Sequence, residues 1–150
     1  MEYKKIKPYK MSEDELRQLW ADEYCDATKP IYTFDDILVK FYESMFDHSF
    51  YESSDRKARD KSILSYNRLE KILWIKATLQ DPEAILKKGW DRDNKTYDNA
   101  RRVAFIKNNY VVIIRFTGAL RATFVTAYEL QDDENIKKIK NSPEWEREGK

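Results

Sequence analysis

The chain has 150 residues, of which 37% are charged, and its formal net charge is +1. A chain of this length is most simply one domain with a buried core. No apolar run is long enough to span a bilayer, and the single cysteine, Cys25, excludes an internal disulfide and is typical of a reducing cytoplasm. We therefore expect a cytoplasmic protein that does not bind membranes. Because the net charge is close to neutral, any nucleic-acid site has to be a local basic surface.

Two helices are predicted before residue 50. Each begins with a capping signature, in which a serine or threonine precedes an acidic residue by three positions. The two pairs are Ser12 with Glu15, and Thr33 with Asp36. Apolar residues then recur at helical spacing, which predicts helices over residues 13–24 and about 34–46. His48, the only histidine, continues the apolar row of the second helix, so we expect it at or just past the end of that face.

A polar segment follows over residues 49–65 and shows no apolar period, so we expect a loop beside His48. This loop is rich in basic residues, namely Arg56, Lys57, Arg59 and Lys61. A third helix is predicted over about residues 66–79. It should stop before Asp81-Pro82, because the residue that precedes a proline disfavours helical backbone.

The second half of the chain changes to the period of strands. A short strand is predicted over residues 84–88, and a polar loop over residues 89–99 follows it. Three consecutive strands come next, over residues 101–107, 110–117 and 121–128, with tight turns at Asn108-Asn109 and Gly118. A charged helix over about residues 133–141 ends the chain. We therefore expect one α+β domain, with N-terminal helices packed on one face of a three- to four-stranded antiparallel meander sheet.

The register of this meander sorts its side chains between two faces. If both turns have two residues, Arg102 lies opposite Arg115, which lies opposite Ala122. One face is then apolar and suits the helices. The other mixes cations, hydroxyls and apolar groups, and includes Arg102, Ala104, Arg115, Thr117, Ala122, Phe124, Thr126 and Tyr128. Such a face suits a shallow binding surface, although this register separates the two arginines from the two hydroxyls by several residues.

Four short motifs occur in order between Phe46 and Leu130. They are Phe46-Asp47-His48, the basic loop, the segment over residues 68–75 that leads into Gln80-Asp81-Pro82, and Val125-Thr126-Ala127-Tyr128. Their order resembles the phage-associated branch of the barnase–EndoU–colicin–RelE nuclease superfamily. The resemblance implies helices packed on an antiparallel sheet and metal-independent cleavage of RNA by a toxin or a phage or mobile-element effector. It also implies a catalytic set of His48, Arg59, Thr126 and Tyr128.

In such a reaction the ribose 2′-hydroxyl attacks the neighbouring phosphate, which yields a 2′,3′-cyclic phosphate and a 5′-hydroxyl. His48 suits proton transfer because the pKa of imidazole lies near neutrality. Arg59 or Arg56 suits the phosphate oxygens, Thr126 can hydrogen-bond phosphate, and Tyr128 can orient His48 or stack on a base. The expected substrate-binding residues are Arg56, Lys61, Arg102 and Arg115. No metal or other cofactor is expected.

Two alternatives stay open on the same fold. One is a non-catalytic RNA- or protein-binding module, and the other is an interaction protein of a phage or plasmid that docks a partner on the mixed sheet face. The expected partners are RNA, such as tRNA or mRNA, and an immunity or antitoxin protein. The sequence contains no Gly-rich phosphate loop, HExxH, paired CxxC or nucleophile elbow.

Overall fold

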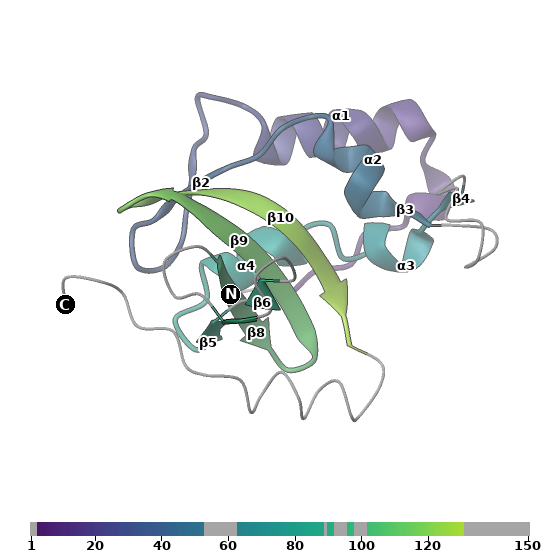
Figure 1. The fold of residues 1–150 in the computed structure, drawn as a ribbon. Helices are drawn as coiled ribbons and strands as arrows, with labels where there is room; N and C mark the ends of the chain where they lie inside the picture. The colour runs from purple at the N-terminus through teal and green to yellow at the C-terminus, as the bar shows by residue number, and fades with distance from the viewer. Residues whose placement is uncertain (1–2, 53–62, 89, 92–95, 98–101, 131–150) are drawn as a thin grey trace.

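The computed structural model describes residues 3–52, 63–88, 90–91, 96–97 and 102–130. Figure 1 shows the curved meander of β8, β9 and β10 with the helices α1, α2, α3 and α4 around it. The helices are η1 (Pro8–Lys10), α1 (Glu13–Tyr24), α2 (Met45–Phe50), α3 (Tyr66–Leu69) and α4 (Trp74–Leu79). The strands are β1 (Ile31–Tyr32), β2 (Leu38–Lys40), β3 (Tyr51–Glu52), β4 (Ile63–Leu64), β5 (Ile85–Lys88), β6 (Trp90–Asp91), β7 (Thr96–Tyr97), β8 (Arg102–Lys107), β9 (Tyr110–Gly118) and β10 (Arg121–Glu129).

The first predicted helix is confirmed as α1, with the bounds that the capping box indicated. The Ser12 hydroxyl accepts from the Glu15 N–H at 3.1 Å, and the Glu15 carboxylate accepts from the Ser12 N–H at 3.0 Å. Two orphan donors at the helix start are thereby satisfied. The buried face of α1 consists of Leu16, Trp20 and Tyr24.

The second predicted helix is wrong. Residues 31–40 form the antiparallel hairpin of β1 and β2, and only Met45–Phe50 is helical. Thr33, which had suggested a helix cap, closes this hairpin, because its hydroxyl accepts from the Ile37 N–H at 3.1 Å. Asp36 has a φ of 69°, a left-handed conformation that aspartate tolerates and a helix does not allow. Local bonds from short polar side chains thus outcompete the helix here.

The third predicted helix is divided into α3 and α4. In a continuous helix, the Lys76 N–H would bond to the Ile72 carbonyl. The buried hydroxyl of Tyr24 occupies this place instead, donating to the Ile72 carbonyl at 2.5 Å and accepting from the Lys76 N–H at 3.0 Å. A side chain from α1 has therefore been inserted into the hydrogen-bond ladder, which is a recognised cause of helix breaks.

The sheet has six strands in the order β1-β2-β10-β9-β8-β5. The α+β class, the strand over residues 84–88 and the three-stranded meander are confirmed, but the sheet is larger than the predicted three or four strands. It is also mixed rather than antiparallel, because β2 pairs with β10 in parallel. The additional strands β1 and β2 come from the segment expected to be helical. Within the expected polar loop, β6 and β7 pair with each other.

The predicted register is right for the first turn and wrong for the second. Arg102 lies opposite Arg115, and Asn108 has the positive φ of 54° that a tight primed turn requires. Arg115, however, lies opposite Thr123 rather than Ala122, because β9 and β10 are joined across two register shifts. The second shift leaves Val125 as an extra residue in β10 and reverses the alternation of the strand. The first shift, before Ala122, places Ala122 and Phe124 on the helix-covered face instead.

The two faces of the sheet carry separate buried clusters. Helix residues and one set of strand residues form the main core, in which the Phe124 ring stacks on Phe41 with centroids 5.0 Å apart. Its buried members include Leu16, Trp20, Phe46, Phe50, Leu69, Ile75, Leu79, Val103, Phe105, Val112, Ile114 and Phe124. The alternate strand residues Ala104, Ile106 and Val111 form a second cluster with Leu130. The helices therefore cover one face, as predicted.

Candidate functional site

The two hydroxyl residues of the closing strand lie on the face opposite the helices. Thr126 pairs with Ile113, and Tyr128 pairs with Val111. Directly paired residues project to the same side of a sheet, and both Ile113 and Val111 belong to the second cluster, against which Tyr128 also packs. The Thr-x-Tyr spacing therefore places both side chains on one face. Each of these two side chains is partly exposed to solvent.

Arg115 lies on the same face and closer to Thr126 than the sequence indicates. A regular two-residue turn would have put Thr126 opposite Val111, four residues from Arg115. The bulge in β10 puts it opposite Ile113, two residues from Arg115. Arg115 and Thr126 are thus diagonal neighbours, whose Cβ atoms in such ladders lie about 7–8 Å apart, within reach of a long side chain. Arg115 is exposed, so its guanidinium is open to an anionic ligand.

The side chains of the remaining predicted cations lie outside the part of the chain that the structure describes. The backbone of Arg102 lies opposite Arg115, but its side chain lies outside the described residues. Arg56, Arg59 and Lys61 also lie outside them, so their assignment to phosphate binding stays a prediction.

His48 lies on the helical side of the sheet. It is an exposed residue of α2, whose buried residues Phe46 and Phe50 belong to the main core, and this helix packs against β10. His48 and the Thr126–Tyr128 pair are therefore on opposite faces of β10. Strand β2 pairs with β10 only up to Thr123. Any approach between the imidazole and Tyr128 must consequently run around the edge of β10 beyond that pairing.

Helix α2 is tied to α1 through the residue before His48. The Arg17 guanidinium donates to the Asp47 carboxylate at 2.6 Å and lies over the Phe46 ring, 4.6 Å from its centroid. The hydrogen bond that Arg17 donates to Asp47 raises the pKa of Arg17. Because both side chains are more than a third exposed, the ion pair stabilises the fold by no more than about 1 kcal/mol. Its consequence is local, since it holds the turn of helix that presents His48.

Two cations that sequence reasoning did not select contact the segments that carry these groups. Arg68 donates to the Ser49 carbonyl at 3.2 Å, one residue after His48. Lys71, only 3% exposed, places its ammonium 3.5 Å from the carboxylate of Glu129, one residue after Tyr128. Helical spacing gave no signal for Lys71, because a residue two positions after Leu69 lies on another side of a helix.

A separate hollow of about 390 Å³ opens beside β3 and β4. Its described lining consists of Glu13, Tyr51, Ile63, Leu64 and Tyr66. The carboxylate in this described lining, that of Glu13, is paired with Arg17 at 3.4 Å. The face with Arg115, Thr126 and Tyr128 remains the better candidate for an anionic substrate.

Comparison of the chain with protein-family models, curated proteins and solved structures found no match. Among the residues that the structure describes, no helix is both long and apolar enough to cross a membrane. In the same part of the chain, no three histidine, cysteine or acidic side chains gather as metal ligands would.

Proposed function

We propose that this chain is a metal-independent endoribonuclease of the toxin or phage-effector type, acting in the cytoplasm. The proposal keeps the resemblance of its motifs to the barnase–EndoU–colicin–RelE superfamily and moves the centre of the site to the sheet face opposite the helices. RNA is the substrate, and an immunity or antitoxin protein is the expected partner in the host cell.

The observation that carries the proposal is the grouping of Arg115, Thr126 and Tyr128 on one face of the sheet. A guanidinium and a hydroxyl that are diagonal neighbours suit the non-bridging oxygens of one phosphodiester. Tyr128 lies two residues along the strand from Thr126, where its ring is placed to stack on a base or its hydroxyl to exchange a proton. This arrangement of the three side chains supports recognition of a phosphate with an adjoining nucleoside.

The chemistry divides among these groups. RNA supplies the 2′-hydroxyl nucleophile, so the protein must stabilise the charge that develops on the phosphorane and transfer two protons. Arg115 and Thr126 serve the first need. His48 is the group best suited by its ordinary pKa to the second, and in this proposal it acts around the edge of β10, with the Tyr128 hydroxyl as the other proton-transfer group.

The test is cleavage of a short RNA by the purified chain in EDTA. The proposal expects a 2′,3′-cyclic phosphate, and no cleavage where the 2′-hydroxyl at the scissile position is replaced by hydrogen. R115M should lower kcat/KM on the order of a hundredfold, as for loss of one charge-stabilising group. R121M is the matched control, because Arg121 is also an exposed arginine and lies at the start of the neighbouring strand β10. Equal activity of the two variants would contradict the assignment of Arg115.

Three further variants test the other groups of the site. Y128F removes a hydroxyl and H48A the imidazole assigned to proton transfer, and T126V removes the hydroxyl assigned to the phosphorane charge. The proposal expects each to slow cleavage by roughly tenfold or more, since positioned acid–base and charge-stabilising groups contribute about a hundredfold or more. Expression of the wild-type chain should inhibit bacterial growth, and H48A should relieve the inhibition.

A non-catalytic RNA- or protein-binding module is the second candidate, and one observation favours it. His48 and the two hydroxyls lie on opposite faces of β10, and a binding surface, unlike a pair of proton-transfer groups, does not need them to meet. This candidate expects salt-dependent RNA binding that R115M weakens and H48A leaves unchanged, with no cleavage by the wild-type chain.

A further inference from the structure

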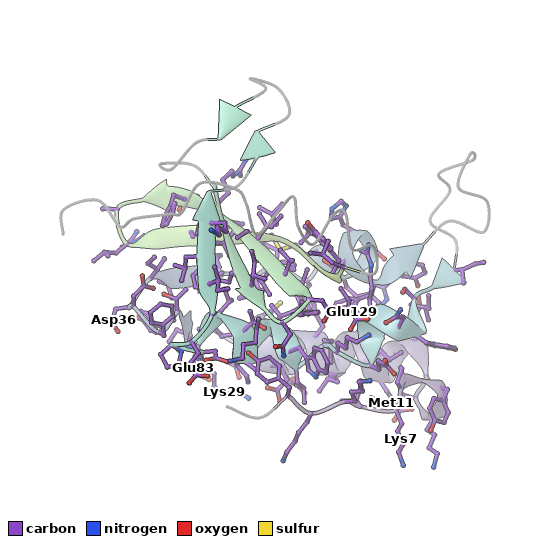
Figure 2. All side chains as sticks on the ribbon, turned by 90° about the horizontal axis from the view of Figure 1, so that it is seen from below. Lys7, Met11, Lys29, Asp36, Glu83 and Glu129 are labelled. Carbon is purple, nitrogen blue, oxygen red and sulfur yellow. The ribbon has the colours of Figure 1, made fainter. Side chains whose placement is uncertain are left out.

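One short segment, residues 68–71 at the end of α3, contacts both segments that carry the candidate catalytic groups. On one side, the Arg68 guanidinium donates to the Ser49 carbonyl at 3.2 Å, next to His48 in α2. On the other side, the Lys71 ammonium lies 3.5 Å from the Glu129 carboxylate, next to Tyr128 in β10. Figure 2 shows Glu129 at the end of the sheet, where the strands meet the helical part of the molecule.

Lys71 is held in a single position by several groups. Besides Glu129, its ammonium lies 3.3 Å from the Glu70 carboxylate and donates to the Asn67 carbonyl at 3.3 Å and to the Asn67 side-chain oxygen. It also lies over the Trp74 ring, 5.7 Å from its centroid. A buried ammonium is costly unless its charge is compensated in this way. The side chain consequently acts as a fixed point rather than as a mobile surface cation.

The end of β10 needs such a fixed point. Beyond Thr123 this strand has β9 on one side and no described strand on the other. Asn109 holds Leu130 from the β9 side, where the Leu130 N–H donates to the Asn109 carbonyl at 2.7 Å. From the helical side, Lys71 holds this end of the strand through Glu129, the residue that follows Tyr128.

We propose that Arg68 and Lys71 are positioning residues, which set α2 and the end of β10 relative to each other and thereby set His48 relative to Tyr128. This inference rests on the proposed ribonuclease function. Neither residue needs to touch RNA in it. Loss of either should therefore lower kcat while KM for RNA stays nearly constant, since misplacement of about 1 Å in a catalytic site costs on the order of a hundredfold.

The first experiment measures cleavage by K71M, with K76M as its matched control. Lys76 forms its 2.6 Å ion pair with Glu23 of α1, not with a residue of β10 or α2. We expect K71M to lower kcat by about tenfold or more with KM within about twofold, and K76M to leave both unchanged. K71R should recover part of the lost kcat because it keeps the charge. The double variant K71M/E129Q should be no slower than K71M, as coupled partners are not additive.

The second experiment does not depend on RNA cleavage. Hydrogen exchange should become at least about tenfold faster over residues 125–130 in K71M and over residues 45–50 in R68M, and unchanged there in K76M. Unchanged exchange in both variants, or equal losses of kcat in K71M and K76M, would overturn the inference. If the wild-type chain cleaves no RNA, the ribonuclease proposal fails, and the exchange data still decide whether residues 68–71 hold the two segments.

Discussion

Removal of one oxygen atom, in Tyr24→Phe, tests why residues 66–79 form two helices. The Tyr24 hydroxyl serves the Ile72 carbonyl and the Lys76 N–H at once, and its side chain is only 4% exposed. A buried polar group left without a partner costs about 1–3 kcal/mol. The Ile72 carbonyl belongs to a fully buried residue, whereas the Lys76 N–H is partly buried and loses less.

We therefore expect Y24F to lower the free energy of unfolding by about 2–4 kcal/mol. At about 2–4 °C per kcal/mol for a chain of this size, the melting temperature should fall by roughly 4–16 °C. Urea unfolding followed by circular dichroism measures the change, and Y9F is the control because Tyr9 is 66% exposed. A loss below about 0.5 kcal/mol, the range of ordinary surface substitutions, would refute the reasoning.

Three further predictions follow from local contacts. Ser12→Ala should cost about 1 kcal/mol in urea unfolding, because it removes half of the capping box, and an unchanged midpoint would contradict the role of the cap. Burial, followed by the charge of Glu43, raises the pKa of the Cys25 thiol to about 11. Iodoacetamide at pH 8 should therefore alkylate the folded chain more slowly than the urea-unfolded chain, and equal rates would contradict this. Burial raises the pKa of Tyr3 to about 12 from 10.0, so its contribution to stability is complete below pH 10 and declines as pH rises toward 12. Tyr3→Phe should therefore make the loss of stability between pH 10 and 12 less steep in urea titrations, and identical slopes would exclude this contribution.

Local signals predicted the elements whose hydrogen bonds close within a few residues. The capping box of α1 is satisfied between Ser12 and Glu15, and the turn at Asn108 needs only a residue that accepts a positive φ. The shared face of Thr126 and Tyr128 likewise needs only the period of a strand. These features come out as predicted because no distant part of the chain takes part in them.

Sequence reasoning failed where two patterns were compatible with one segment. Ile37, Val39 and Phe41 are buried at a period of two, yet Ile37 and Phe41 also fit the spacing of a helix together with Phe34 and Met45. The choice was made by the pairing of β2 with β10, about 80 residues away in the chain, as the register of Leu38 with Arg121 shows. Periodicity cannot contain that information, because it does not record which strand is available as a neighbour.

By itself, the sequence determined an α+β chain with a capped first helix, a meander of three strands, and a strand whose threonine and tyrosine share a face. Only the tertiary structure decided that the sheet has six strands, that a tyrosine from α1 divides the third helix, and that a bulge brings Thr126 to the diagonal of Arg115. It also decided that His48 belongs to the opposite face. The physical reason is that capping and alternation are short-range effects, whereas strand partners, register shifts and inserted side chains depend on groups that meet only after the chain has folded.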